Sequence, residues 1–80
     1  MFIHLGEDTV IRIDEVVAII NYGLFLKEEG NKALIERAKM ENKLRDIGRQ
    51  MTKSVVITDK YIYFSPFSPT TLKKRSRHFY

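Results

Sequence analysis

Residues 61–75 read YIYFSPFSPTTLKKR, and this stretch decides the fold of the C-terminal third of the chain. It begins with four apolar residues whose aromatic and branched side chains favour a strand. Ser68 and Pro69 then have the residue types that open a helix, because serine caps free N–H groups and proline needs no N–H at the first helical position. The expected helix carries three consecutive cations, Lys73, Lys74 and Arg75. The stretch therefore predicts a strand that leads into a positively charged helix.

Upstream of this stretch, short apolar runs have the spacing of hairpins. Residues 2–13 contain two strand-forming runs separated by a turn at Gly6, and residues 52–64 contain two more around a turn at 59–60. The run at 16–20 is apolar throughout and favours a strand, although a buried helical turn has the same pattern. The expected strands are 2–5, 9–13, 16–20, 52–58 and 61–64.

Helix formers dominate the middle of the chain. We expect a helix from Asn31, as its N-cap, to Leu44, with Gly48 as the stop and with Ala33 and Met40 on its apolar face. The fold class is then α+β, with a mostly antiparallel five-stranded sheet, one central helix and a short C-terminal helix. We expect residues 1–80 to form a single domain.

Three of the expected strands are apolar on both faces, so both sides of the sheet require cover. Two modest helices shield one face at most, and we therefore expect the second face to meet another copy of the chain. The interface residues expected are Val17, Ile19, Tyr61 and Tyr63. The alternative is that the loop at residues 24–26 folds back over this face.

Length and composition limit the classes of protein to which this chain can belong. A chain of 80 residues hides only about 60% of the surface that its unfolded form exposes, so it gains from oligomerisation. The absence of cysteine excludes disulfides and thiolate metal sites and fits a reducing cytosol. No signal peptide or membrane-spanning run is recognisable. We expect a cytoplasmic protein without a membrane partner.

The charge is strongly divided along the chain. Residues 1–42 contain five Lys or Arg against eight Asp or Glu, a net charge of −3, whereas residues 43–80 contain nine against two, a net charge of +7. Such a division attracts polyanions to the positive side. The plain alternative is that these charges are ordinary solvated surface.

Catalysis has few candidate residues. The only histidines are His4, inside an expected strand, and His78, near the C-terminus, and neither has a partner motif. They also lack the spacing of metal ligands. The sequence predicts no enzyme activity, metal site, cofactor or small-molecule substrate.

Nucleic-acid binding needs cations that reach successive phosphates, and two groups qualify. One lies before the valine-rich strand, near Lys43 and Arg45 at the expected helix end, and the other lies on the terminal helix. The expected DNA contacts are Arg49, Lys53, Lys73, Lys74, Arg75 and Arg77. Repetition around an oligomer would join them into a continuous basic belt.

Three ordered motifs, FIHLGED at residues 2–8, KSVVIT at 53–58 and YIYFSP at 61–66, resemble the RemB branch of the RemA/RemB family of bacterial extracellular matrix regulatory proteins. The resemblance implies a DNA-binding regulator of biofilm matrix genes, and RemA-type proteins form rings that DNA can wrap around. By position, Arg49 and Lys53 match the basic segment implicated in DNA contact in the RemA branch. That branch has adjacent arginines where this chain has Arg49 and Gln50, and an arginine where this chain has Glu15.

These observations predict a homo-oligomeric ring that binds duplex DNA mainly through phosphates, with sequence preference from DNA shape and bending. One alternative is a protein-interaction module whose apolar face docks a different protein. Another is attachment to anionic membrane surfaces through the basic tail.

Overall fold

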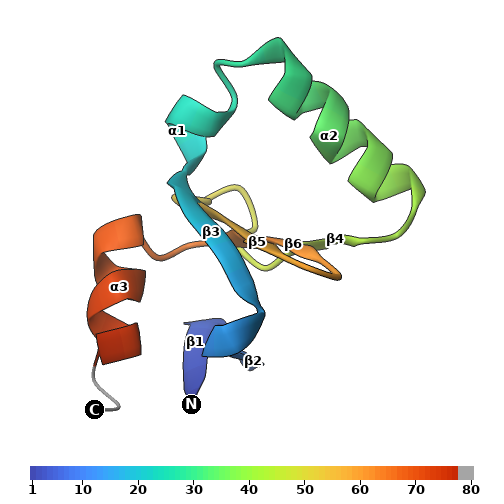
Figure 1. The fold of residues 1–80 in the computed structure, drawn as a ribbon. Helices are drawn as coiled ribbons and strands as arrows, with labels where there is room; N and C mark the ends of the chain where they lie inside the picture. The colour runs from blue at the N-terminus through green and yellow to red at the C-terminus, as the bar shows by residue number, and fades with distance from the viewer. Residues whose placement is uncertain (78–80) are drawn as a thin grey trace.

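The computed structural model describes residues 1–77, and its class is α+β, as predicted. Within these residues there are three helices, α1 (Tyr22–Phe25), α2 (Glu29–Met40) and α3 (Pro69–Arg77), together with a short 3₁₀ turn at Ile13–Glu15. The strands are β1 (Phe2–Gly6), β2 (Thr9–Arg12), β3 (Val16–Asn21), β4 (Leu44–Asp46), β5 (Ser54–Thr58) and β6 (Ile62–Ser65). Figure 1 shows their arrangement.

The strands form two sheets instead of the single five-stranded sheet that was expected. β1 and β2 make a separate antiparallel hairpin, and the other four follow the order β3-β5-β6-β4. In the larger sheet, β4 pairs with β6 in parallel and the other pairs are antiparallel. β4 was not expected, because its three residues, Leu44, Arg45 and Asp46, have no strand pattern of their own. Parallel pairing with β6 imposes the extended conformation.

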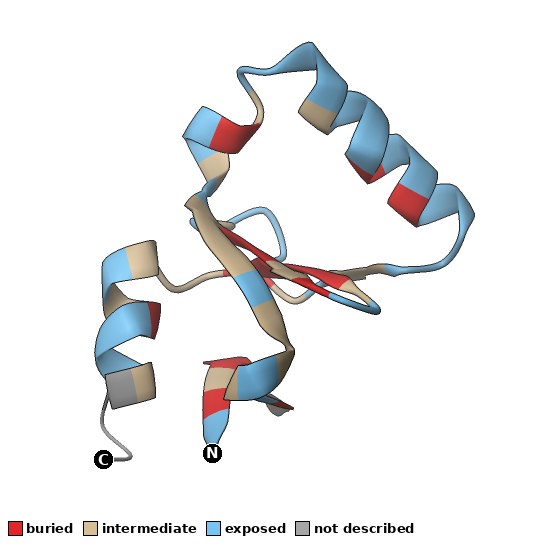
Figure 2. Ribbon diagram, in the orientation of Figure 1, coloured by how far each residue is buried: buried red, intermediate tan, exposed pale blue. Residues whose placement is uncertain are grey.

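The four-stranded sheet is covered on both faces by its own chain (Figures 1 and 2). The hairpin and α3 pack on one side, in a core that contains Val56, Tyr63 and Leu72. On the other side α1 and α2 pack over Val55 and Phe64. Val55 and Val56 are both 0% exposed, which confirms that this strand is apolar on two buried faces.

Neither face of the four-stranded sheet is therefore left open for another copy of the chain, contrary to expectation. The hairpin was expected to extend the sheet, but it lies across the sheet and buries Ile3 and Leu5. On the opposite face Phe25 is buried and Leu26 packs beside it. The alternative in which residues 24–26 fold back over this face holds for Phe25 and Leu26, with α2 adding to the cover, whereas Leu24 is 60% exposed.

Helix α2 is shifted from its expected position. It starts at Glu29, so Asn31 is not its N-cap; the Asn31 side chain instead donates a hydrogen bond to the Phe25 carbonyl at 3.0 Å. It ends before Asn42, which adopts a φ of +58°, well short of Gly48. The N–H groups of Asn42 and Lys43 bond to the carbonyls of Lys39 and Ala38, which is the Schellman pattern of a helix C-terminus.

The buried face of α2 also differs from the expected one. Ile35 and Ala38 face the sheet, whereas Ala33 and Met40 are exposed. Ile35 and Ala38 are three positions apart and lie on one side of a helix. The thin apolar pattern of this helix did not identify its buried side in advance.

Two buried serines fix the segment that leads from β6 to α3. The Ser65 hydroxyl donates to the Leu5 carbonyl at 2.6 Å, and the Ser54 hydroxyl donates to the Phe67 carbonyl at 2.6 Å. Gly6 carries a φ of +138°, and a β-carbon there would lie 2.9 Å from the Pro66 ring. These contacts hold the hairpin and the start of α3 against the end of β6.

Candidate nucleic-acid interface

Helix α3 is fixed to the rest of the fold and bears several cationic side chains. The Ser68 hydroxyl accepts a hydrogen bond from the Thr71 N–H at 3.1 Å, which confirms Ser68 as the N-cap with Pro69 after it. Leu72 is 0% exposed and anchors the helix in the hairpin-side core. Lys73, Lys74 and Arg75 are exposed on the helix.

Arg75 is oriented by an aromatic contact. Its guanidinium lies 4.4 Å from the centroid of the Phe67 ring, a cation–π distance. The His4 ring meets the same Phe67 ring edge-on at 5.7 Å. Lys73 and Lys74 have no ion-pair partner within the described part of the chain. The Arg77 side chain lies outside what the structure describes, and so does His78.

Arg49 lies in the loop between β4 and β5, in an ion pair. Its Nε is 2.8 Å from a carboxylate oxygen of Glu7, which lies in the turn of the β1–β2 hairpin. The Arg49 side chain remains 77% exposed. Its backbone N–H donates to the Asp46 carboxylate at 3.2 Å. The predicted contact residue thus has acidic groups beside it.

Lys53 follows in the same loop and is exposed. Its backbone is fixed on two sides, since its N–H donates to the Ser65 carbonyl at 2.8 Å and its carbonyl accepts from the Tyr22 N–H at 3.0 Å. The ammonium group of Lys53 forms no ion pair with any residue the structure describes. A fixed backbone with a free cation suits a phosphate contact.

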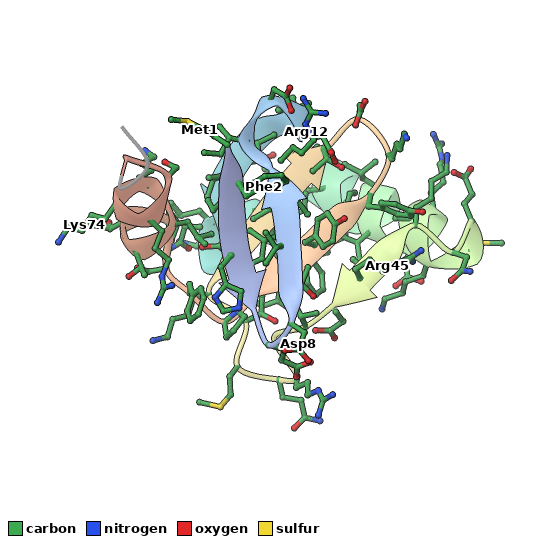
Figure 3. All side chains as sticks on the ribbon, turned by 90° about the horizontal axis from the view of Figure 1, so that it is seen from below. Met1, Phe2, Asp8, Arg12, Arg45 and Lys74 are labelled. Atoms are coloured by element: carbon green, nitrogen blue, oxygen red, sulfur yellow. The ribbon has the colours of Figure 1, made fainter. Side chains whose placement is uncertain are left out.

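A third group of cations, which was not expected from the sequence, surrounds Tyr61. Arg45 lies over the Tyr61 ring at 4.3 Å, and it belongs to β4 and not to a helix end. Lys43 and Lys60 line the same shallow surface. Pairing of β4 with β6 creates this group, so no local pattern could reveal it. Figure 3 shows Arg45 and Lys74 on opposite sides of the molecule.

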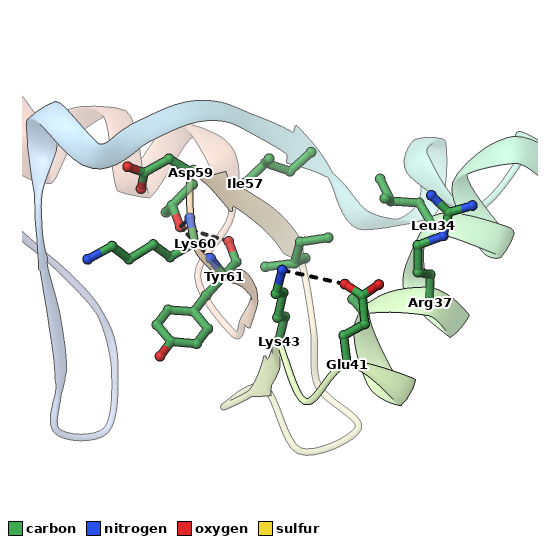
Figure 4. Close-up of a pocket in the computed structure, with 11 residues that line it drawn as sticks. Leu34, Arg37, Glu41, Lys43, Ile57, Asp59, Lys60 and Tyr61 are labelled. Atoms are coloured by element: carbon green, nitrogen blue, oxygen red, sulfur yellow. Dashed lines mark hydrogen bonds and ion pairs between the residues drawn. The ribbon is translucent and has the colours of Figure 1, made fainter.

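A pocket of about 240 Å³ adjoins this third group, between α2 and the β5–β6 turn (Figure 4). Leu34, Ile57 and Ile62 supply apolar lining. Lys43 at the rim pairs with Glu41 at 3.5 Å. The lining mixes Arg37, Lys43 and Lys60 with the carboxylates of Glu41 and Asp59, which makes the pocket a poor anion site.

The four residues expected at a subunit interface occupy different environments. Val17 on the edge strand β3 is 69% exposed. Ile19 and Tyr61 are half-buried against the hairpin-side core, and Tyr63 lies inside that core at 8% exposed. Burial raises the pKa of the Tyr63 hydroxyl, and the charge of Glu15 adds to the rise. Of the four, Val17 offers the most surface to a partner.

Comparison with known proteins identifies the family. The chain matches the RemA-like family, described as extracellular matrix regulatory protein A-like, over residues 2–76. The chain belongs to the RemA-like family. It is also 34% identical over 77 residues to Extracellular matrix regulatory protein B of Bacillus subtilis (strain 168), an alignment that covers 96% of this chain and 91% of that protein. The resemblance seen in the motifs is therefore confirmed.

The RemA-like match includes nearly every predicted contact residue. Arg49, Lys53 and the three exposed cations of α3 fall inside residues 2–76, whereas Arg77 falls just beyond. The helix that carries most of these cations is thus part of the region shared with the RemA-like family. Helix α3 and the Arg49 loop are therefore the candidate nucleic-acid interface.

The His4 side chain is held by contacts within the fold of this RemA-like chain. The His4 ring donates from Nε2 to the Glu7 carbonyl and packs on Phe67, as expected of a structural residue. Within residues 1–77, no three His, Asp or Glu side chains converge as a metal centre requires. Among these residues there is also no helix that is long and apolar enough to cross a bilayer.

Proposed function

We propose that this chain is a DNA-binding transcriptional regulator of biofilm matrix genes. It acts in the cytoplasm as a homo-oligomeric ring and binds the phosphates of duplex DNA. The curated relative is named as a matrix regulatory protein, which supports a regulatory role. The resemblance to the RemA branch, whose members form rings around which DNA can wrap, supports assembly into a ring and binding to DNA.

The observation that carries this proposal is the attachment of α3. Its N-terminus is capped by Ser68, Leu72 anchors its middle, and the Phe67 ring supports Arg75 near its end. Phosphate contact favours cations on a rigid element, because the element sets their register along the backbone. Three exposed cations on one fixed helix meet this requirement.

The arrangement of cations supports an oligomer. Arg45 and Lys74 lie on opposite sides of one subunit (Figure 3), so a single copy offers DNA only part of its charge at once. Repetition of the subunit brings α3 of several copies to one DNA, and the contacts then reinforce one another through effective concentration.

The edge of the larger sheet offers a place for subunits to meet. β3 is an edge strand, and none of its six residues is charged or proline. Natural proteins protect exposed edges with charges, prolines or bulges, and β3 has only a register irregularity between Val16 and Ala18. An apolar edge with Val17 exposed is suited to a second copy.

A protein-interaction module is the second candidate function. Phe2 and Val10 are each 54% exposed on the outer face of the hairpin, next to the exposed Met1. Neighbouring exposed apolar side chains favour protein contact. If this function is correct and the first is wrong, the chain binds no duplex DNA even in dilute buffer.

A salt titration of DNA binding tests the first proposal. If about six phosphates are neutralised, the logarithm of affinity falls with the logarithm of salt concentration at a slope of about −5. Replacement of Lys73, Lys74 and Arg75 by alanine should weaken binding to all sequences alike and reduce the slope by about three. The matched control replaces Lys27, Lys32 and Lys39, which removes the same charge from the α1–α2 side.

The control variant distinguishes a direct contact between α3 and DNA from an effect of the protein's net charge. Equal losses in the two triple variants would mean that α3 makes no special contact. A flat salt response of the wild-type protein would remove the phosphate mechanism altogether.

A further inference from the structure

One ion pair joins two loops that are distant in the sequence. Among the ion pairs of the described residues, the others join residues two or three positions apart, whereas Glu7 and Arg49 are 42 positions apart. Both carboxylate oxygens take part, with Nε to Oε1 at 2.8 Å and Nη2 to Oε2 at 3.5 Å. The contact is a side-on pairing of a carboxylate with a guanidinium.

The two loops are shaped to bring these side chains together. Glu7 has a φ of +46° and Arg49 a φ of +48°, so both adopt the left-handed conformation that non-glycine residues rarely take. Gly48 is buried, and a β-carbon there would collide with Thr52. The Asp46 carboxylate holds the Arg49 N–H. The pairing therefore follows from constrained backbone on both sides.

The pairing changes what Arg49 can offer to DNA. The guanidinium already has an anionic acceptor, and Asp46 adds a second negative charge nearby. The pair is nevertheless accessible, since the Glu7 side chain is 42% exposed and that of Arg49 is 77% exposed. Exposed ion pairs are weak and can exchange partners. A DNA phosphate could thus replace Glu7, but only in competition with it.

We propose that Glu7 is a specificity-determining residue of the DNA interface. Its carboxylate competes with phosphates for the Arg49 guanidinium and so suppresses sequence-independent binding through Arg49. Arg49 contributes to binding only where the DNA shape places a phosphate well enough to displace Glu7. This inference rests on the proposed DNA-binding function and goes beyond it, because it assigns an acidic residue of the hairpin turn to the control of that interface.

The test measures binding to a fluorescent duplex of random sequence at several salt concentrations. Glu7→Gln keeps the shape of the side chain and removes its charge, and it should bind about two- to five-fold more tightly than wild type, as expected for release of an exposed ion pair. The salt slope should steepen by about one, because Arg49 becomes free to neutralise one more phosphate. In an Arg49→Gln background the same change at Glu7 should have no such effect.

Glu36→Gln is the matched control. Glu36 is an exposed glutamate paired with Lys39 on α2, so its replacement makes the same change in net charge without touching the Glu7–Arg49 pair. Equal gains from Glu7→Gln and Glu36→Gln would overturn the inference, because general charge would then explain both. Weaker binding by Glu7→Gln would also overturn it, since Glu7 would then hold Arg49 in its binding position.

The outcomes separate this inference from the function on which it rests. If the wild-type protein, Glu7→Gln and Glu36→Gln all bind DNA with equal affinity, the role of Glu7 is contradicted but the DNA-binding function is not. Failure of every variant to bind at low salt contradicts the DNA-binding function itself, and the role of Glu7 with it. Circular dichroism of each variant confirms that a changed affinity does not reflect a changed fold.

Discussion

The Ser65 hydroxyl donates a hydrogen bond to the Leu5 carbonyl at 2.6 Å, although the two residues are 60 positions apart. Both residues are 0% exposed. The same hydroxyl oxygen accepts a hydrogen bond from the Phe67 N–H at 3.1 Å. One serine thus joins the hairpin, the end of β6 and the segment that leads to α3. The position of the cationic helix depends on this buried polar contact.

Replacement of Ser65 by alanine should therefore destabilise the protein. The change leaves the buried Leu5 carbonyl without its partner, and an unsatisfied buried group costs about 1–3 kcal/mol. The free energy of unfolding, measured with urea, should fall by this amount. Ser76→Ala is the control, because the Ser76 hydroxyl bonds to the Lys73 carbonyl at an exposed position and its loss should matter little. Equal stabilities of the two variants would show that the Ser65 contact contributes nothing.

Replacement of Val17 by lysine tests the proposed contact at the edge of β3. A lysine buried between subunits loses its hydration, and a penalty above about 1.4 kcal/mol weakens association more than tenfold. Light scattering over a dilution series should show smaller particles for Val17→Lys than for wild type. Val10→Lys makes the same change at an exposed position on the hairpin and should leave the mass unaltered. If only Val10→Lys dissociates the oligomer, the subunits meet at the hairpin and not at β3.

The raised pKa of Tyr63 predicts a loss of stability at alkaline pH. Burial and then the charge of Glu15 raise its pKa above the ordinary value of 10.0, while Arg45 opposes the rise. The folded protein therefore keeps its proton when the unfolded chain has lost it. This contribution is complete below pH about 10 and declines as the pH rises through the folded pKa, by about 1.4 kcal/mol for each unit of pKa difference.

Tyr63→Phe removes the titrating group and supplies the comparison. Urea unfolding of both proteins from pH about 8 to about 11 should show a steeper alkaline decline for wild type than for the variant. The subtraction cancels the titration of lysines, which the two proteins share. Parallel curves would mean that ionisation of Tyr63 has no link to folding.

The hairpins and the terminal helix were predictable because their signals are local. The Gly6 turn separates two β-prone runs, and Ser68 with Pro69 marks the start of α3. These features depend on residues a few positions apart. The assignment to the family was also within reach of the sequence, since the motifs that resemble it lie in the part that the family match covers.

The missed features depend on contacts between distant residues. Residues 44–46 become a strand only because β6 lies beside them, and that pairing brings Arg45 over Tyr61. The helix was extended too far because the left-handed conformation of Asn42 was not anticipated. The pairing of Arg49 with Glu7 likewise required two loops to meet. Part of the candidate site was therefore invisible to any local pattern.

The sequence by itself determined the two hairpins, the strand at 16–20, the division of charge and the basic helix, because each follows from the residues' own chemistry or from close neighbours. Only the tertiary structure decided how those parts meet. It placed the hairpin across the sheet, covered both apolar faces within one chain and set Glu7 against Arg49. The physical reason is that apolar surface can be buried by any segment that reaches it. The hydrophobic pattern therefore predicts that a strand face is buried, but it does not predict which segment buries it.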